Sequence, residues 1–143
     1  MRVDLPPEQV FALWTDALDR WWPRAFTWSQ DKLDRIAIEP HVGGRCYERG
    51  PLGFHLDFGR VIECEPPVRL VFTWQIAFDR TPQPDPAQAS EVEIRLRAAG
   101  PSATDVEIEH RHFERHGAQA AAYRAGMEHG WDELVRRLAA AAR

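Results

Sequence analysis

Three histidines near the end of the chain have the types and spacing that could support chemistry. His110 and His112 alternate along the chain, so a strand would point both side chains to one face, and His116 follows four residues later. Three histidines can bind zinc, and one histidine on an apolar wall can act as a general acid or base. Glu107 and Glu109 point to the opposite face and cannot orient a metal-bound ring. We therefore expect no metal, no cofactor and no catalytic residue, and interpret His110 as a wall residue that orients a ligand.

Arg60 is the second candidate for chemistry. If alternation holds, it shares a face with Phe58 and Ile62 and lies opposite Trp74. A cation–π contact would be natural there, and a guanidinium on the cavity side could bind a carboxylate or phosphate. A bulge at Gly59 would instead turn the side chain to solvent. The sequence leaves both positions of Arg60 open.

The remaining reactive residue types form no recognisable catalytic motif. Cys46 and Cys64 lack C-x-x-C spacing, and buried free cysteines in strands are the commoner case. The chain contains no Gly-rich phosphate loop, no G-x-S-x-G elbow and no H-E-x-x-H run. We assign no role to the cysteines, and two thiols without a disulfide framework favour a reducing, cytoplasmic location.

The six tryptophans are unusual for a chain of 143 residues. About half of the aromatic set is expected to be plain core, and the rest is expected to line a cavity for an apolar or aromatic molecule. Phe72 and Trp74 share a strand face, Met127 and Trp131 share a helical stripe, and the two pairs should face each other. The candidate ligand-binding residues are Trp22, Trp28, Tyr47, Arg60, Phe72, Trp74, His110, Met127 and Trp131.

The elements that must position these residues form three successive sections of the chain. A helical entry covers residues 5–15, and a second short helix is expected from Asp16 to Trp22, where Pro23 ends it. Turn signals then separate short strands, and a Pro-rich exposed loop runs from Asp79 to Ser90. The expected strands cover residues 35–39, 45–49, 55–65, 70–78, 91–97 and 105–113.

The last two strands have a predictable register. Pairing Arg95 with Glu107 places Arg97 opposite Asp105, and Glu91 opposite Arg111. The same register leaves Val92, Ile94 and Leu96 beside His110, Ile108 and Val106. One face of this pair is therefore apolar and the other charged, which indicates a sheet with one solvated side.

A long helix closes the chain after Gly117. Its apolar stripe has the helical period and consists of Tyr123, Met127, Trp131, Leu134, Val135 and Leu138. Gly126 and Gly130 each cost a helix about 1 kcal/mol relative to alanine. They could mark close packing, a kink or a lighter first half of the helix. The helix must lay its stripe across the apolar face of the sheet, and a curved sheet around one helix leaves a candidate cavity.

Composition and charge exclude several classes of protein. The net charge of −4, from 18 basic and 22 acidic residues, lacks the excess of positive charge that general binding of nucleic acid requires. No apolar run approaches the roughly 18 residues of a membrane span, and no apolar signal-peptide core follows Met1. The length predicts a single domain over residues 1–143.

Several segments in the same order resemble a known family. These are Leu5-Pro6-Pro7-Glu8-Gln9-Val10-Phe11-Ala12-Leu13-Trp14-Thr15-Asp16, Arg20-Trp21-Trp22-Pro23, Gly43-Gly44-Arg45, the run from Gly59 to Trp74, and Gly130-Trp131-Asp132-Glu133-Leu134 with the four residues after it. The chain resembles the START-like helix-grip superfamily (SRPBCC), in the branch related to the activator of the heat-shock-protein-90 ATPase.

The resemblance implies an α+β helix-grip fold. A curved antiparallel sheet of about six strands would wrap around the long C-terminal helix, with two short helices near the N-terminus. Members normally have a strand before the Pro-Pro helix, which here must be short, since only Met1 to Leu5 precede the prolines. A shortened first strand would expose a sheet edge and favour a homodimer.

Fold alone does not determine function in this superfamily, so three functions stay open. The first is binding of a small apolar or aromatic molecule between the sheet and the C-terminal helix. The second is a protein-interaction or co-chaperone-like module that would use the Pro-rich loop. The third is an enzyme of cyclase or dehydratase type that would use His110 and Arg60 in the same cavity. We favour the first and expect no demonstrated enzymatic activity.

Overall fold

Alternating charged and apolar side chains set the register of two neighbouring strands, β6 (Ser90–Ala98) and β7 (Thr104–Arg111), in the computed structural model, which describes residues 1–142. Arg95 pairs with Glu107, Glu91 with Arg111 and Ile94 with Ile108, so the predicted register is confirmed throughout. Because successive side chains point to opposite faces, this register separates an apolar face from a charged face.

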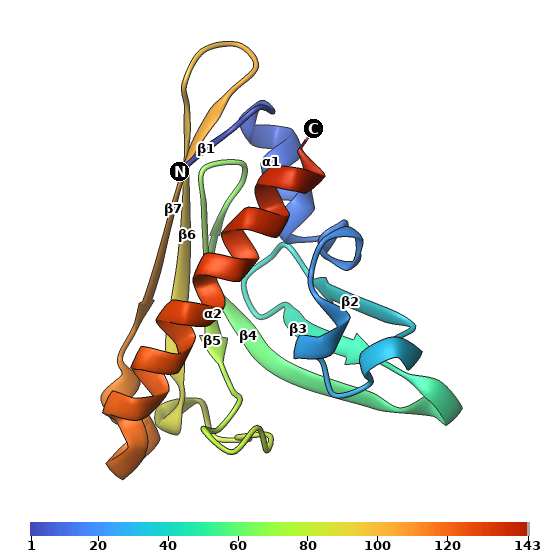
Figure 1. Ribbon diagram of the computed structural model, residues 1–143, viewed down its shortest axis with the longest axis vertical. Coiled ribbons are helices and arrows are strands. Elements are labelled where there is room, and N and C mark those ends of the chain that lie inside the picture. The colour runs from blue at the N-terminus through green and yellow to red at the C-terminus, as the bar shows by residue number, and fades with distance from the viewer. Residues whose placement is uncertain (143) are drawn as a thin grey trace.

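The two strands belong to a sheet that curls around the C-terminal helix (Figure 1). Its order is β1-β7-β6-β5-β4-β3-β2, and neighbouring strands are antiparallel. The described chain has seven strands where about six were expected, because the short N-terminal segment pairs with β7. The other strands are β1 (Arg2–Val3), β2 (Arg35–Ile38), β3 (Arg45–Arg49), β4 (His55–Glu65) and β5 (Arg69–Trp74).

The edge of the sheet at β7 is only partly covered. Arg2 and Val3 pair with Asp105 and Thr104, and the Met1 carbonyl accepts a hydrogen bond from the Val106 N–H. Among the described residues, no strand lies outside β7 beyond Val106. The short first strand therefore leaves an exposed edge, as the resemblance implied, and the homodimer stays a prediction.

Helix α2 (Ala120–Ala141) crosses the concave face of the sheet, and α1 (Pro7–Trp14) lies beside its C-terminal end (Figure 1). Residues 16–22 form a short 3-10 turn, Leu18–Arg20, in place of the second helix that the sequence predicted. The remaining 3-10 turns are Arg24–Phe26, Gln30–Lys32, Pro51–Gly53, Pro86–Gln88 and Phe113–Gln119. No helix within residues 1–142 is both long and apolar enough to cross a membrane.

Two strands end earlier than their sequence patterns predicted. β5 stops at Trp74, and the chain then turns so that only Ile76 forms an isolated bridge, with Pro82. β7 stops at Arg111 because His112 adopts a left-handed conformation with φ of 66°. The left-handed residue turns the chain out of the sheet and into the 3-10 turn that leads to α2.

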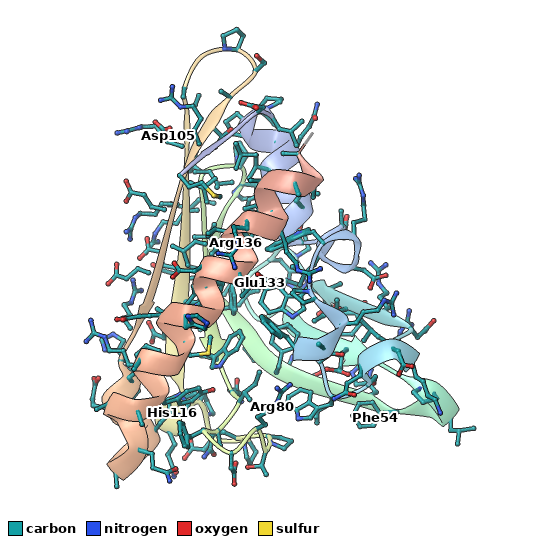
Figure 2. The ribbon with its side chains drawn as sticks, viewed as in Figure 1. Phe54, Arg80, Asp105, His116, Glu133 and Arg136 are labelled. Carbon is teal, nitrogen blue, oxygen red and sulfur yellow. The ribbon has the colours of Figure 1, made fainter. Side chains whose placement is uncertain are left out.

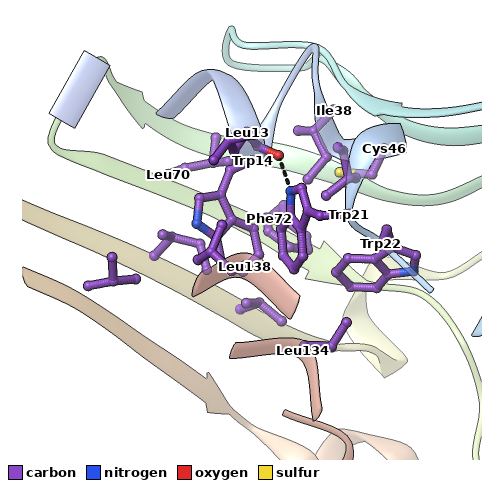
Figure 3. Packing of buried hydrophobic residues seen from close by; sticks show 14 of the residues in the cluster. Leu13, Trp14, Trp21, Trp22, Ile38, Cys46, Leu70, Phe72, Leu134 and Leu138 are labelled. Carbon is purple, nitrogen blue, oxygen red and sulfur yellow. Dashed lines mark hydrogen bonds between the residues drawn. The ribbon is translucent and has the colours of Figure 1, made fainter. Parts of the chain in front are cut away.

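The core lies between the concave face, α1 and the second half of α2 (Figure 3). Trp14 is 1% exposed, and its ring meets the ring of Trp21 edge-on at 4.9 Å between centroids. The Trp21 indole N–H donates to the Leu13 carbonyl at 2.6 Å. This bond holds together the two ends of the segment from Leu13 to Trp21. Leu134 and Leu138 of α2 are fully buried against this cluster, which anchors the C-terminal half of the helix.

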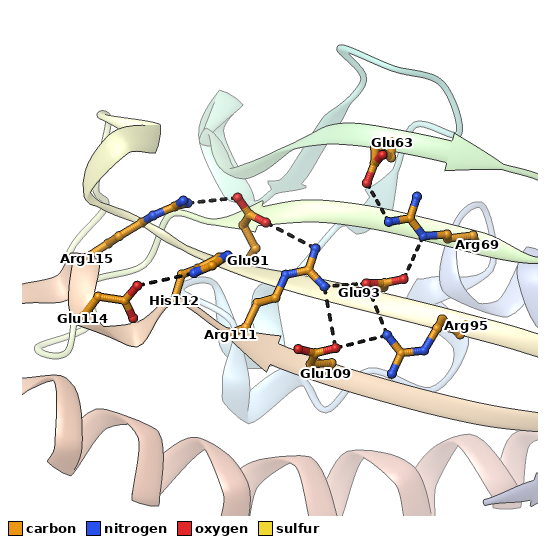
Figure 4. Close-up of polar contacts among 10 residues, drawn as sticks. All are labelled: Glu63, Arg69, Glu91, Glu93, Arg95, Glu109, Arg111, His112, Glu114 and Arg115. Carbon is orange, nitrogen blue, oxygen red and sulfur yellow. Dashed lines mark hydrogen bonds and ion pairs between the residues drawn. The ribbon is translucent and has the colours of Figure 1, made fainter.

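The convex face carries a connected group of ion pairs (Figure 4). Glu93 is at its centre: its side chain is 7% exposed and pairs with Arg69, Arg95 and Arg111. Arg69 also bonds Glu63 at 2.7 Å. Burial by itself raises the pKa of Glu93, but hydrogen bonds from Arg69 and Arg111 and the surrounding positive charges outweigh it and lower the pKa to about 2. The charged side chains around Glu93 on the convex face therefore pair with one another.

Candidate ligand-binding cleft

The first half of α2 is held less tightly than the second, and hollows lie on both of its sides. From Ala120 to Gly130 only Tyr123 is buried, whereas Trp131, Leu134 and Leu138 follow as buried residues. On the side of β5 lies a hollow of about 240 Å³, here called the central cleft. Its lining residues are Trp22, Phe26, Trp74, Ile76, Ala77, Phe78, Arg80, Tyr123, Gly126, Met127, Gly130 and Leu134.

Aromatic rings form the inner wall of the central cleft. The Trp22 and Trp74 centroids are 6.4 Å apart, and Trp131 lies 6.0 Å from Trp74 on the far side. Phe78 meets Tyr123 edge-on at 5.6 Å. The expected meeting of the Phe72/Trp74 strand face with the Met127/Trp131 stripe is confirmed for Trp74 and Trp131. Flat, polarisable walls of this kind suit a flat apolar molecule.

Gly126 and Gly130 create part of the cleft's volume. The two residues are one helical turn apart and both line the cleft. Apart from its chain neighbours and the nearby backbone of α2, a Cβ atom built on either glycine would find no heavy atom within 4 Å among the described residues. Of the three explanations that the sequence left open, close packing is therefore wrong. The glycines instead leave room along the helix where side chains would otherwise stand.

The polar groups of the inner wall are already paired. The Trp74 indole N–H donates to the Tyr123 hydroxyl oxygen at 2.8 Å, and that hydroxyl donates to the Ile76 carbonyl at 2.6 Å. Burial raises the pKa of Tyr123 to about 12, while the Trp74 hydrogen bond and the charge of Arg80 act in the opposite direction. Tyr123 is therefore a neutral, fixed wall residue at physiological pH.

A second hollow, the β7 groove, lies on the opposite side of α2. It is open, about 460 Å³ in volume, and Ile108, His110, Met127 and Trp131 are among its lining residues. Acidic and basic side chains stand around it, namely Glu109, Arg124, Glu128 and Asp132. Met127 lines both hollows. The mixed charges and open shape distinguish the β7 groove from the aromatic central cleft.

His110 is held by hydrogen bonds at both ring nitrogens. The Trp131 indole N–H donates to His110 Nδ1 at 3.1 Å, so the proton of the neutral ring is on Nε2. That Nε2 lies 2.7 Å from Ser90 Oγ, and Ser90 Oγ lies 2.8 Å from Nε2 of His116. Burial, with a smaller effect of His116, lowers the pKa of His110 to about 3. His110 is therefore a neutral wall residue whose two ring nitrogens are both hydrogen-bonded within the protein.

The structure does not bring all the sequence-predicted site residues together. Trp22, Trp74 and Met127 line the central cleft, and Trp28 lines a small hollow of about 20 Å³ that shares Trp22 and Trp74 with it. His110 and Trp131 line the β7 groove, and Phe72 is 1% exposed within the core. Tyr47 and Arg60 line none of these three hollows.

Arg60 faces away from the cleft because the β4 backbone is irregular around Gly59. A Cβ on Gly59 would lie 2.0 Å from the Thr73 carbonyl oxygen, so only glycine permits this approach of β4 to β5. The pairing register between β3 and β4 shifts between Cys46 and Tyr47, as it does at a β-bulge. Arg60 is consequently exposed and bonds Asp57 at 3.0 Å rather than contacting Trp74.

Tyr47 belongs to the convex face by simple alternation. Its neighbours Cys46 and Glu48 are buried, so Tyr47 points to the other side of β3. There its ring stacks on His55 at 5.4 Å, and the Arg45 guanidinium lies 5.0 Å from the ring centroid. The wrong expectation came from treating an aromatic residue in a strand as a wall residue without fixing its face.

Sequence reasoning missed several residues of the central cleft. Phe26, Ile76, Phe78, Arg80 and Tyr123 line it but come from a short turn, a loop and the start of the long helix. The i, i+4 spacing of Gly126 and Gly130 was the one sequence signal that could have located it. Loop residues lack a period, so nothing in the sequence indicated that the start of the Pro-rich loop borders the cleft.

The histidines and cysteines make no metal site among residues 1–142, where no group of three or more His, Cys, Asp or Glu side chains is placed to hold an ion. His112 bonds Glu114 at 3.3 Å and has left the strand. Cys46 is buried and Cys64 half-buried, and both are free thiols. Burial raises the pKa of both thiols, which makes them poor nucleophiles.

A family model matches almost the whole chain. The model is that of the Activator of Hsp90 ATPase homolog 1-like protein family, and it matches residues 4–143. Comparison with curated proteins finds no match.

Solved structures share the fold over nearly their full length. The anthrahydroquino-Gama-pyrone synthase Txn09, complexed with SUM, is 30% identical, with 97% of this chain and 91% of that chain covered and a TM-score of 0.66. The self-sacrificing resistance protein CalC from Micromonospora echinospora is 26% identical, with 99% and 90% covered and a TM-score of 0.66. The Aha1 dimer from Colwellia psychrerythraea, at 15% identity, 99% and 91% coverage and a TM-score of 0.65, is similar in fold alone.

Proposed function

This chain belongs to the Activator of Hsp90 ATPase homolog 1-like protein family, and on that premise we propose that it binds a small aromatic molecule in the central cleft. The observation that carries the proposal is the unfilled space beside Gly126 and Gly130, which the rings of Trp22, Trp74 and Tyr123 border. A helix interior usually avoids glycine, so two glycines that border an apolar hollow support a binding role.

Size and lining support a compact ligand. The cleft of about 240 Å³ is smaller than the roughly 300–1,000 Å³ of pockets for drug-sized molecules. Its lining is mostly apolar, with Phe26 and Phe78 near the loops. A bicyclic aromatic body, stacked against an indole and in contact with the bare backbone of α2, fits these walls best.

Binding of naphthalene-2-carboxamide, a neutral bicyclic probe, tests the proposal. Trp22 and Trp74 lie in the wall, so we expect the probe to quench tryptophan fluorescence in a saturable way and to raise the melting temperature. Gly126→Leu places a side chain in the cleft and should abolish binding, while leucine favours the helix.

Ala125→Leu is the matched control, because Ala125 is exposed on the same helix and lines neither hollow. It should bind the probe as the unaltered chain does. Saturable binding that survives Gly126→Leu, or no saturable binding at all, would reject the central cleft as a binding site.

A synthase is the second candidate, favoured by the 30% identity to the protein described as an anthrahydroquino-Gama-pyrone synthase. The cleft would then hold part of an aromatic precursor while it cyclises, and the walls would restrict the precursor's conformation. His110 is a weak base in this setting, because burial lowers its pKa to about 3, and Trp131 and Ser90 bond its two ring nitrogens. Turnover of an aromatic polyketide precursor that Gly126→Leu abolishes and Ala125→Leu preserves would support the enzyme.

Two copies of the chain are proposed to associate, as in the protein described as an Aha1 dimer. The uncovered outer edge of β7 beyond Val106 supports this proposal. Molar mass measured by light scattering across micromolar concentrations tests it, and a constant monomer mass would overturn it. We keep the cytoplasm as the proposed location, and two free thiols are compatible with a reducing compartment.

A further inference from the structure

Arg80 occupies a distinctive position at the central cleft. Of the described residues that line the cleft, Arg80 alone carries a charge. It follows β5 in the turn from Ala77 to Thr81, beside the first half of α2 and on the side of the molecule that carries Phe54 (Figure 2). An unshielded cation at the mouth of an otherwise apolar hollow points to a ligand with an opposite charge.

The turn that carries Arg80 is fixed by hydrogen bonds on both sides. The Arg80 N–H donates to the Ala77 carbonyl at 2.9 Å, and the Ala77 N–H donates to the Thr81 carbonyl at 2.8 Å. The Trp28 indole N–H donates to the Arg80 carbonyl at 2.7 Å. The Arg80 backbone has a φ of 72°, an uncommon conformation for a residue other than glycine. These bonds hold the backbone of Arg80 in place beside the cleft.

The Arg80 guanidinium has no hydrogen bond or ion pair within residues 1–142. Asp79 is the adjacent carboxylate, but its Oδ1 accepts from both the N–H and the hydroxyl of Thr81. Arginines on the convex face behave differently: Arg69 and Arg111 each pair with two or more carboxylates. The contrast leaves the Arg80 side chain available to a ligand.

Arg80 and Tyr123 line the same cleft. Burial raises the pKa of Tyr123, while the Trp74 hydrogen bond and, to a smaller extent, the charge of Arg80 act in the opposite direction. The polar atoms of Trp74 and Tyr123 are bonded to each other and to the backbone of Ile76. An anionic group is therefore best accommodated at Arg80, with the apolar rings of the ligand further inside.

We propose that the ligand of the central cleft is a compact aromatic carboxylate, whose ring system lies between Trp22, Trp74 and the glycines of α2 and whose carboxylate pairs with Arg80 at the mouth. This inference rests on the proposed function and deepens it, because it adds the charge and the orientation of the ligand. A guanidinium binds a planar carboxylate through two parallel N–H···O bonds, which orients the ring plane as well as attracting the charge.

A matched pair of probes tests the charge. Naphthalene-2-carboxylate and naphthalene-2-carboxamide have the same ring system and nearly the same shape, and only the first is an anion. For the unaltered chain at neutral pH and low salt, we expect the carboxylate to bind about fivefold more tightly, as a solvent-accessible ion pair allows. The advantage should shrink as salt is added, because the mouth is open to solvent.

Arg80→Gln should remove the preference for the carboxylate and leave the affinity for the carboxamide within about twofold. Arg20→Gln is the matched control: Arg20 is the other described arginine whose guanidinium has no hydrogen bond or ion pair, and it does not line the cleft. It should change neither affinity. Arg80→Lys should retain part of the preference, because it keeps the charge and loses the paired donors.

The outcomes separate this inference from the proposed function. Equal affinity for both probes, with binding blocked by Gly126→Leu, overturns the carboxylate and keeps aromatic binding in the cleft. A charge preference that Arg20→Gln removes as effectively as Arg80→Gln also overturns it, because the attraction would then be a general surface effect. Failure of both probes to bind the unaltered chain overturns the inference and the proposed function together.

Discussion

The two faces of the same curled sheet differ in how completely their side chains satisfy one another. On the convex face, Glu93 is surrounded by Arg69, Arg95 and Arg111, and the charges form a closed group. On the concave face, the rings around Trp74 meet at about 6 Å between centroids and leave a hollow beside the first half of α2. One face has its charges paired within the protein, and the other has space and an unpaired cation.

The comparison teaches where stability and binding reside in this fold. Ion pairs across neighbouring strands stabilise the convex face of the sheet, whereas apolar contacts with Leu134 and Leu138 of α2 stabilise the concave face. Within α2 itself, Leu134 and Leu138 pack tightly against the core, whereas Gly126 borders free space. Substitutions on the two faces should accordingly affect different measurements.

The largest expected effect is on the concave core. Trp14 is 1% exposed, and Trp14→Ala should lower the free energy of unfolding by about 3–5 kcal/mol, because a large ring is lost and a cavity remains. Urea denaturation measures the loss. Trp14→Phe should cost far less, since the Trp14 indole N–H is buried without an acceptor among the described residues. Equal losses for alanine and phenylalanine would contradict this account of the core.

The next effect concerns the convex face. Glu93→Gln should lower the free energy of unfolding by about 2–3 kcal/mol, because three arginines lose a shared carboxylate. Glu107→Gln is the control: Glu107 is exposed and bonds only Arg95, so we expect a change within about 0.5 kcal/mol. Neither change should alter binding of naphthalene-2-carboxamide, and a loss of binding with Glu93→Gln would show that the faces are coupled.

The same carboxylate predicts a pH dependence. The pKa of Glu93 is about 2 in the folded protein and has its ordinary, higher value when the chain unfolds. Its contribution is therefore fully present above the unfolded pKa and decreases as the pH falls from about 4.5 towards 2. Unfolding experiments over this range should show a smaller acid loss for Glu93→Gln than for the unaltered chain, and parallel curves would contradict the assignment.

At the cleft, we expect a substitution that raises the free energy of unfolding, by a smaller amount than the losses above. Gly126→Ala should raise the free energy of unfolding by up to about 1 kcal/mol, because alanine favours the helix and its Cβ meets no atom within 4 Å. The same methyl group narrows the cleft and should weaken naphthalene-2-carboxamide binding by a few-fold. Thermal unfolding and fluorescence titration measure the two effects, and a variant with higher stability and undiminished binding would place the ligand elsewhere.

The smallest effect sharpens the boundary between the faces. Arg60→Ala removes an exposed ion pair with Asp57 and should change the free energy of unfolding by less than about 0.5 kcal/mol. It should leave the affinity for naphthalene-2-carboxylate unchanged, unlike Arg80→Gln. Loss of carboxylate binding with Arg60→Ala would mean that the anion lies on the convex face, which would reverse the comparison.

Local patterns in the sequence determined the sheet and the long helix. The charges of β6 and β7 are enough to specify their register, because the observed pairing places arginines opposite carboxylates and keeps Ile94 beside Ile108. The helical period of Trp131, Leu134 and Leu138 likewise specified which side of α2 faces the core. The resemblance to the helix-grip superfamily, which the family model confirms over residues 4–143, supplied the overall arrangement of sheet and helix.

Tertiary structure decided the face of each irregular residue and therefore the composition of the cleft. The close approach of Gly59 to Thr73 turned Arg60 outward, and the left-handed turn at Arg80 brought a different arginine to the cleft. Alternation fails wherever a strand bulges or ends, because the face of each later residue then depends on contacts with distant segments. Sequence periodicity reports regular elements, whereas this site is made by their interruptions.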